Sequence, residues 1–350
     1  MPRKVALIAG SNGIVGWAIA ELLASARDWD IICVSRRPSP LGDLGKRVDL
    51  DLRDQAACRS AAPLFKDVTH LFYCARATSP DPVEDERINA AMFTNIVEAV
   101  EAGAANLAHI QVMQGSKWYG CHLGPYKTPA VEDDPRHLSP NFYYLQQDFL
   151  ENRQPQAAWT WSALRPHVVW GITLGYPHSF VVLLAAYASL SKHLGLPLTF
   201  PGSDACFNSV SQATDARLLA QAMLWAATTP RCANNAFNII NGDLFRWRYL
   251  WPKVAAFFDI ETGPVQPTRL AERVRLNEEV WRDIAQAHDL KTKRFSDLGE
   301  WAYFDFTLRF DADDISQTTK ARKYGFDQFV DTEEVLMTIF HQLRDQRVIP

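Results

Sequence analysis

The stretch that decides the fold is VALIAGSNGIVGWAIAELLASA, residues 5–26. A short apolar run leads into three glycines, Gly10, Gly13 and Gly16, and a helical pattern of apolar residues follows them. A strand that passes through a G-x-x-G-x-x-G turn into a helix is typical of the opening unit of a dinucleotide-binding α/β fold. The sequence therefore predicts a strand over 5–10, a tight turn, and a helix that begins at about residue 14.

The three glycines would each serve that turn differently. Gly10 permits the tight turn, Gly13 lets the backbone approach a pyrophosphate, and Gly16 lets the helix pack close to the sheet. The helix N-terminus favours an anion at the same place. The alternative is a glycine-rich turn without a ligand. The predicted cofactor loop comprises Gly10, Ser11, Asn12, Gly13, Ile14, Val15 and Gly16.

The rest of the first half alternates strand and helix patterns. Strand-like runs occupy 30–35, 69–75, 108–114 and 159–166, with amphipathic segments such as 88–103 between them. This alternation predicts a doubly wound α/β (Rossmann) domain, with a parallel sheet covered on both faces. The second half reads mostly as helices and loops, and Pro252 is expected in the first turn of one helix.

We expect two structural units from these patterns. Residues 1–172, joined by about 205–243, would form the NADP-binding Rossmann domain. Residues 173–204 and 244–350 would form a smaller, mostly helical C-terminal lobe that binds substrate over the carboxyl ends of the strands.

The end of the second strand discriminates between nicotinamide cofactors. An NAD site usually offers an acidic residue there, but this chain offers Ser35, Arg36 and Arg37, and Asp30 lies at the other end of the strand. Two guanidiniums and a hydroxyl suit a 2′-phosphate. The alternative is a solvated basic turn. We predict NADPH as the cofactor.

Two further strand ends fall at the predicted cofactor edge. Asp51 and Leu52 follow a third strand, where an aspartate could bond the adenine amino group or equally cap a helix. Tyr73, Cys74 and Ala75 end the fourth strand and should border the ribose and phosphates of the cofactor. The alternative for these three residues is a plain buried strand end.

The segment NFYYLQQD, residues 141–148, resembles a short-chain dehydrogenase active site but lacks its Tyr-x-x-x-Lys spacing. Tyr143 is followed four places on by Gln147, and Tyr144 by Asp148. A lysine does stand just beyond the carboxyl end of strand 108–114, where Lys117 precedes Tyr143 by 26 residues. The two can converge from separate segments, and a nearby cation makes a phenol a better donor to an oxyanion. The alternatives are a surface lysine and a core aromatic residue.

Composition excludes several other classes of function. The 350 residues carry a net charge of −4 with no basic block, so we expect no nucleic-acid partner. The longest apolar run, 180–190, is shorter than the ~20 residues of a membrane span and reads as a buried helix. Six scattered cysteines suggest reduced thiols in a cytoplasmic protein without a metal site. A homodimer is suggested by the fold alone.

The chain resembles the progesterone 5β-reductase/iridoid synthase-like family of extended short-chain dehydrogenases. The resemblance covers nearly the whole chain and implies that Lys117 and Tyr143, rather than Tyr144, form the catalytic pair. It rests on GSNGIVG (10–16), SRRP (35–38), QGSKWYG (114–120), SPNFYYLQQD (139–148), SALRPHVVWG (162–171), FPGSDACFNSV (200–210), AFNIINGDLFRW (236–247) and KYGFDQFVDTEE (323–334).

The resemblance also implies a reaction, the NADPH-dependent 1,4-reduction of an enone or enal. Tyr143 would donate a hydrogen bond to the developing enolate, and Lys117 would support the tyrosine electrostatically and help position cofactor or substrate. Pro166 and Val168 should border the nicotinamide. Tyr119 is a candidate substrate residue because it follows Lys117 closely.

Three departures from the family pattern bear on the substrate. Plant members commonly have histidine where this chain has Trp118, often tryptophan where it has Arg76, and tend to have glutamate where it has Gln147. Other functions remain open: 1,2-reduction of an aldehyde or ketone, and a non-catalytic NADP-sensing protein. The missing Tyr-x-x-x-Lys argues against a sugar-nucleotide epimerase or dehydratase.

Overall fold

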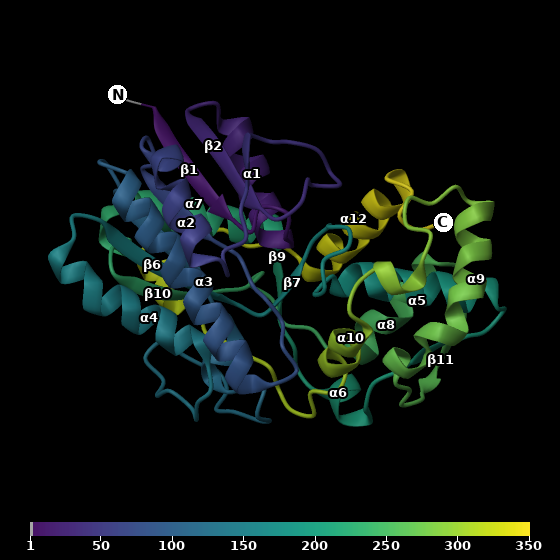
Figure 1. Ribbon diagram of the computed structural model, residues 1–350. Coiled ribbons are helices and arrows are strands. Elements are labelled where there is room, and N and C mark those ends of the chain that lie inside the picture. The colour runs from purple at the N-terminus through teal and green to yellow at the C-terminus, as the bar shows by residue number, and fades with distance from the viewer. Residues whose placement is uncertain (1–2) are drawn as a thin grey trace.

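The computed structural model describes residues 3–350 and contains a parallel sheet beside a helical lobe (Figure 1). Seven strands form the sheet in the order β10-β6-β5-β4-β1-β2-β3, and each neighbouring pair is parallel. The strands are β1 (Lys4–Ala9), β2 (Trp29–Ser35), β3 (Lys46–Asp49), β4 (His70–Tyr73), β5 (His109–Met113), β6 (Thr160–Pro166) and β10 (Asn235–Ile239). The prediction of a doubly wound α/β fold is confirmed.

Helices cover both faces of this sheet because its strands are apolar on both sides. In β1, Leu7 and Ala9 face one hydrophobic cluster, and Ala6 and Ile8 face the other. The first cluster packs under α2 (Gln55–Ala61), α3 (Pro82–Gly103) and α4 (Phe142–Arg153). The second packs under α1 (Ile14–Ala26) and α7 (Ala216–Thr228). Strand order reverses between β1 and β4, so the fold places its ligand crevice at their carboxyl ends.

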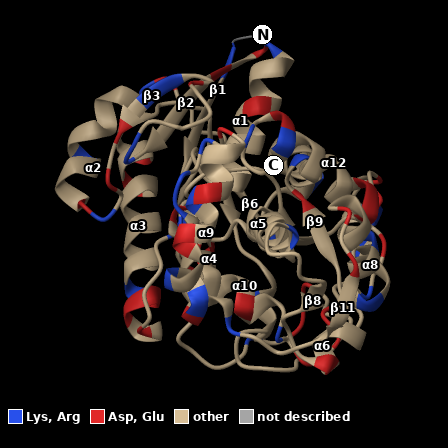
Figure 2. Cartoon of the chain, turned by 90° about the vertical axis from the view of Figure 1, so that its right-hand side faces the viewer, with Lys and Arg blue, Asp and Glu red and all other residues tan. Residues whose placement is uncertain are grey.

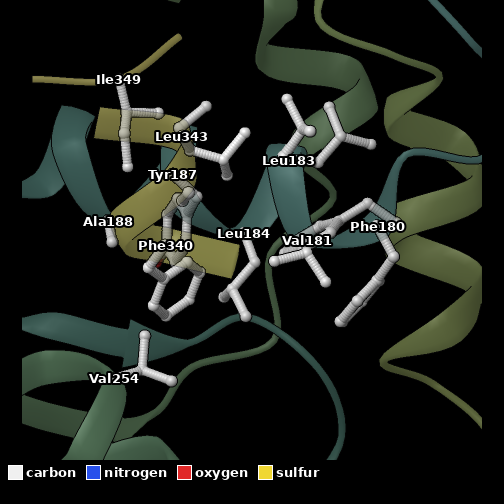
Figure 3. Packing of buried hydrophobic residues seen from close by; sticks show 14 of the residues in the cluster. Phe180, Val181, Leu183, Leu184, Tyr187, Ala188, Val254, Phe340, Leu343 and Ile349 are labelled. Carbon is white, nitrogen blue, oxygen red and sulfur yellow. The ribbon is translucent and has the colours of Figure 1, made fainter. Parts of the chain in front are cut away.

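The helical lobe has a core of its own. Its principal helices are α5 (Phe180–His193), α8 (Trp247–Phe257), α9 (Val274–Ala287), α10 (Trp301–Thr307) and α12 (Thr332–Asp345). Figure 3 shows apolar side chains of α5, among them Leu184 and Tyr187, beside Phe340 of α12 and Val254 of α8. Every residue of α5 from Phe180 to Ser191 is buried, which confirms the prediction of a buried helix over the longest apolar run.

Short elements connect the sheet and the lobe. Strand β7 (Val168–Trp170) pairs with β9 (Ala213–Asp215), and β8 (Leu198–Phe200) pairs with β11 (Thr262–Val265). Helix α6 (Asp204–Asn208) lies in the lobe, whereas α11 (Thr319–Lys323) returns to the sheet and packs on β10. The division into a unit of 1–172 with about 205–243 and a unit of 173–204 with 244–350 is retained here as a proposal.

The expectation for Pro252 was wrong. Helix α8 begins at Trp247, so Pro252 lies in its interior rather than in its first turn. Proline lacks an N–H and leaves the carbonyl four residues earlier without its helical partner. Trp251 and Val254, on either side of the proline, are fully buried in the lobe core. Tertiary packing therefore holds the helix together where local propensity would end it.

Charged residues of both signs are interspersed over the face of the molecule that Figure 2 shows. Many form short-range pairs at the surface, such as Arg87 with Glu84 at 2.7 Å. Within residues 3–350 no helix combines the length and the apolar character that crossing a membrane would require.

Candidate active site

A cavity of about 410 Å³ opens at the carboxyl ends of the central strands. Its wall combines residues that follow β1, β4, β5 and β6 with residues of the helical lobe. From the sheet side come Gly13, Ile14, Val15, Cys74, Ala75, Arg76, Lys117, Tyr143, Pro166 and Val168. The cavity thus brings together residues that the sequence assigned to cofactor binding and to catalysis.

The glycine loop after β1 can be built only from glycine at two positions. Gly10 has φ +84°, and a Cβ there would lie 2.7 Å from the backbone of Ala75. A Cβ on Gly16 would lie 2.2 Å from the carbonyl oxygen of Gly10. Helix α1 therefore starts tight against the turn, and Gly13 presents bare backbone to the cavity. This arrangement fits a bound pyrophosphate.

The segment after β2 joins the glycine loop and leaves two cations free. Asn12 Nδ2 and Ser35 Oγ both donate to the carbonyl oxygen of Arg37, each at 2.7 Å. The side chains of Arg36 and Arg37 are exposed and pair with no carboxylate among the described residues. Asp30, at the opposite end of β2, pairs with Arg3 at 3.2 Å. Hence the strand end beside the glycine loop offers guanidiniums and no acid of its own.

The segment after β3 carries the half-buried acid Asp51. The Arg53 side chain donates to both carboxylate oxygens of Asp51, which lowers the pKa of this carboxyl to about 2. The cap of α2 is Asp54, which accepts from Ala57 N at 2.9 Å, so the alternative of Asp51 as a helix cap was wrong. Leu52 is buried, and its carbonyl accepts from Asn95.

At the end of β4 the structure separates three residues that the sequence grouped. Cys74 and Ala75 line the cavity, as a cofactor-bordering role requires. The ring of Tyr73 instead packs in the core against Phe93, with ring centroids 4.8 Å apart. Alternation along the chain explains why Tyr73 and Cys74 differ, since neighbouring side chains point to opposite faces of the sheet, and Ala75 lies beyond the end of the strand.

Lys117 lies in a short 3₁₀ helix, Ser116–Tyr119, directly after β5. Its Nζ is 3.3 Å from Asp85 Oδ2 of α3 and 4.9 Å from the centre of the Phe142 ring. Burial lowers the pKa of the Lys117 ammonium, an effect that Asp85 opposes and Arg76 reinforces. Lys117 is therefore a half-buried cation on the cavity wall and not a free surface lysine.

One asparagine ties the lysine segment to the tyrosine helix. Asn141, the N-cap of α4, accepts from Tyr143 N at 3.2 Å and donates from Nδ2 to Lys117 O at 2.9 Å. Tyr143, in the first turn of α4, lines the cavity. Burial raises the pKa of its phenol to about 12, although the nearby Arg76 charge lowers it. At neutral pH this phenol is a hydrogen-bond donor.

Gln147 stands where a short-chain dehydrogenase would carry its lysine, and its surroundings already hold a buried cation. Its Oε1 accepts from Arg165 Nη2 at 3.1 Å and from Gln114 Nε2 at 3.3 Å, and its Nε2 donates to Glu151 at 2.7 Å. Arg165, on β6, is almost fully buried and also donates to Gln114 Oε1. A lysine at position 147 would place a second buried cation beside the Arg165 guanidinium, which is energetically unfavourable.

Tyr119 does not line the cavity. The 3₁₀ helix turns its ring toward β10, where its hydroxyl donates to Asn238 Oδ1 at 2.5 Å. Tyr144, the neighbour of Tyr143, is also turned away from the cavity and donates to Trp118 O at 2.7 Å. Trp118 is buried, and its ring lies 3.6 Å from the Arg165 guanidinium. These residues hold the lysine segment in place.

The helical lobe supplies the cavity wall that the sequence did not identify. His167 Nδ1 lies 2.9 Å from Asp314 Oδ2, and Tyr126 donates to the same carboxylate at 2.6 Å, which fixes the loop after α10 against β6. The only sequence signal for this wall was the abundance of aromatic residues. Its members are Tyr176, His178, Phe180, Cys206, Phe245, Trp247, Tyr303, Phe306, Thr307 and Phe310.

Comparison with known proteins agrees with the resemblance seen in the motifs. Residues 46–350 match the model of the PRISE-like Rossmann-fold domain. The chain belongs to this family. Among similar curated proteins, the 3-oxo-Δ4,5-steroid 5β-reductase of Arabidopsis thaliana is 32% identical, over 99% of this chain and 94% of that protein. The (S)-8-oxocitronellyl enol synthase of Catharanthus roseus is 33% identical, over 99% and 93%.

Solved structures share the fold of this chain at low sequence identity. UDP-glucose 4-epimerase from Thermotoga maritima superposes with a TM-score of 0.70, 17% identity, and coverage of 97% of this chain and 99% of that one. RMD from Pseudomonas aeruginosa, complexed with NADPH, gives a TM-score of 0.66 at 16% identity, with coverage of 98% and 99%. At such identities the likeness concerns the fold. The family assignment makes this PRISE-like protein an oxidoreductase.

Proposed function

We propose that this PRISE-like protein reduces the activated C=C bond of an enone or enal with NADPH. The observation that carries the proposal is the phenol of Tyr143, which lines the cavity, stays protonated, and is tied through Asn141 to the segment of Lys117. A carbonyl oxygen that gains negative charge during reduction needs such a preorganised donor. Membership in a family with a steroid 5β-reductase supports the same reaction.

NADPH is the proposed cofactor because two features of the chain fit it. The backbone of Gly13 faces the cavity at the start of α1, where a pyrophosphate is favoured. Arg36 and Arg37 stand exposed at the neighbouring strand end and suit a 2′-phosphate. When bound, NADPH supplies a hydride from C4 of its nicotinamide to the β-carbon of the enone.

In this proposal the residues of the chain bind and orient the substrate and the nicotinamide, and they stabilise the enolate. Tyr143 donates its hydrogen bond to the carbonyl oxygen and stabilises the enolate. Lys117, held by Asp85, keeps a positive charge at the same wall of the cavity. Pro166, at the end of β6, and Val168, at the start of β7, form an apolar border for the nicotinamide and restrict water there.

Two neighbouring tyrosines allow a matched test. Tyr143→Phe removes the proposed donor, whereas Tyr144→Phe removes a hydroxyl that is turned away from the cavity. We expect turnover of an enone to fall about 10²–10³-fold in Tyr143→Phe, the typical cost of one lost oxyanion donor, and to persist in Tyr144→Phe. The dissociation constant of NADPH should stay unchanged in both variants.

The lysine is tested beside the tyrosine. Lys117→Ala should lower turnover while the protein still binds NADPH, because its charge acts at the reacting end of the cavity. Unchanged turnover in both Lys117→Ala and Tyr143→Phe, with cofactor binding intact, would remove these residues from the mechanism.

A further inference from the structure

One arginine in the cavity has no partner. Arg76 follows β4, is exposed and lines the cavity. Its guanidinium carbon lies 5.5 Å from the centre of the Phe142 ring, and no hydrogen bond or ion pair joins it to any residue within 3–350. The rings of Phe142 and Tyr143 meet edge to face, with centroids 4.5 Å apart, so the guanidinium stands close to the proposed reaction centre.

The other charged residues on the cavity wall each have a hydrogen-bond or ion-pair partner. Lys117 pairs with Asp85, and Asp314 lies against His167 and Tyr126. Burial, together with the nearby cations, lowers the pKa of His122 to about 4 and that of His178 to about 3, so both imidazoles are neutral at pH 7. Arg76 therefore gives the cavity a positive charge that the protein itself does not neutralise.

The remaining wall suits a carbon skeleton. Tyr176, Tyr303, Phe306 and Phe310 come from the helical lobe and face the same space as the guanidinium. A guanidinium beside apolar walls forms charge-assisted hydrogen bonds with an anionic group of a ligand. A guanidinium matches a carboxylate in shape and charge, and a single guanidinium balances one negative charge rather than the two of a phosphate.

We propose that Arg76 binds a carboxylate of the substrate, so that this enzyme prefers unsaturated keto acids or aldehyde acids to neutral enones. The inference rests on the proposed enone reduction for the identity of the reacting group. It concerns the acidic group alone, which a ligand can present without being reduced.

Binding to the NADP⁺ complex separates this inference from the reaction. The probes are a saturated keto acid that cannot be reduced at C=C and the methyl ester of the same acid, which differs in charge. We expect wild-type protein to bind the acid about 10- to 100-fold more tightly than the ester, the range of one charge-assisted pair. Arg76→Gln should lose this preference, and Arg76→Lys should keep part of it.

The control variant replaces an arginine that lies outside the cavity. Arg59→Gln, an exposed arginine of α2 outside the cavity, should leave the preference intact. Equal binding of acid and ester by wild-type protein overturns the proposal. So does an Arg76→Gln variant that keeps the preference but binds NADPH more weakly, because Arg76 would then serve a cofactor phosphate. If instead the preference is found but no enone is reduced, the carboxylate site stands and the proposed reaction fails.

Discussion

The substitution Gln147→Lys would restore the Tyr-x-x-x-Lys spacing of short-chain dehydrogenases, but it should destabilise this protein rather than improve its activity. Lysine has no acceptor, so Arg165 Nη2 and Gln114 Nε2 would each lose a bonded oxygen, at about 1–3 kcal/mol apiece. Two cations about 4 Å apart repel by about 4 kcal/mol at an effective dielectric of 20, and Glu151 would offset part of this. If Glu151 offsets about half of the repulsion, the net loss in the free energy of unfolding is about 4–8 kcal/mol.

The assay is urea unfolding followed by tryptophan fluorescence, with Gln147→Glu as the matched control. Glutamate keeps an oxygen for the Arg165 guanidinium, and this attraction opposes the repulsion between the new carboxylate and Glu151, so its cost should be smaller than that of lysine. A second readout is turnover of the double variant Lys117→Ala with Gln147→Lys, which should stay as low as that of Lys117→Ala alone. Equal stability of the lysine and glutamate variants, or recovered turnover in the double variant, would refute the reasoning.

Three further predictions follow from the same structure. Replacing Arg36 and Arg37 together with alanine should weaken NADPH binding about 10- to 100-fold and leave NADH binding unchanged in a fluorescence titration, whereas equal loss for both cofactors would contradict the 2′-phosphate site. Because the pKa of Tyr143 is about 12, its phenol does not titrate between pH 6 and 10. The pH profile of kcat over this range should therefore have the same shape in wild type and in Tyr143→Phe. Burial lowers the pKa of His109 from 6.5 to about 3, so the unfolded chain binds a proton that the folded chain excludes and stability falls as the pH drops through this window. His109→Gln should therefore reduce the slope of unfolding free energy between pH 6 and 4 by about 1.4 kcal/mol per pH unit, and an unchanged slope would contradict the burial argument.

Local patterns predicted the parts of this fold that local chemistry determines. The strand, glycine turn and helix of residues 5–26 form where expected because Gly10 and Gly16 meet steric demands that no other residue meets. The helix over 180–190 forms because its apolar residues are buried on every side. Lys117 and Tyr143 line the same cavity, as their predicted places in the fold suggested. The hydrogen bond from Asn141 Nδ2 to Lys117 O, which spans 24 residues, joins their two segments.

Long-range packing decides what the sequence could not show. Tyr119 follows Lys117 by two residues, yet its side chain points away from the cavity because its hydroxyl donates a hydrogen bond to Asn238, 119 residues along the chain. Helix α8 tolerates Pro252 because the lobe core buries the residues around it. Tyr303 and His178 come from distant segments to line the same cavity as Tyr143, with their own ring centroids 4.5 Å apart, and no local pattern predicts this placement.

The central claim is that hydride is delivered to carbon in an activated double bond, and isotope labelling tests it most directly. The protein is incubated with an enone and NADPH that carries deuterium at C4 in the transferred position, and the product is analysed by NMR and mass. The account predicts a saturated carbonyl compound with deuterium at the β-carbon. An allylic alcohol with deuterium at the former carbonyl carbon would contradict it and make this protein a carbonyl reductase.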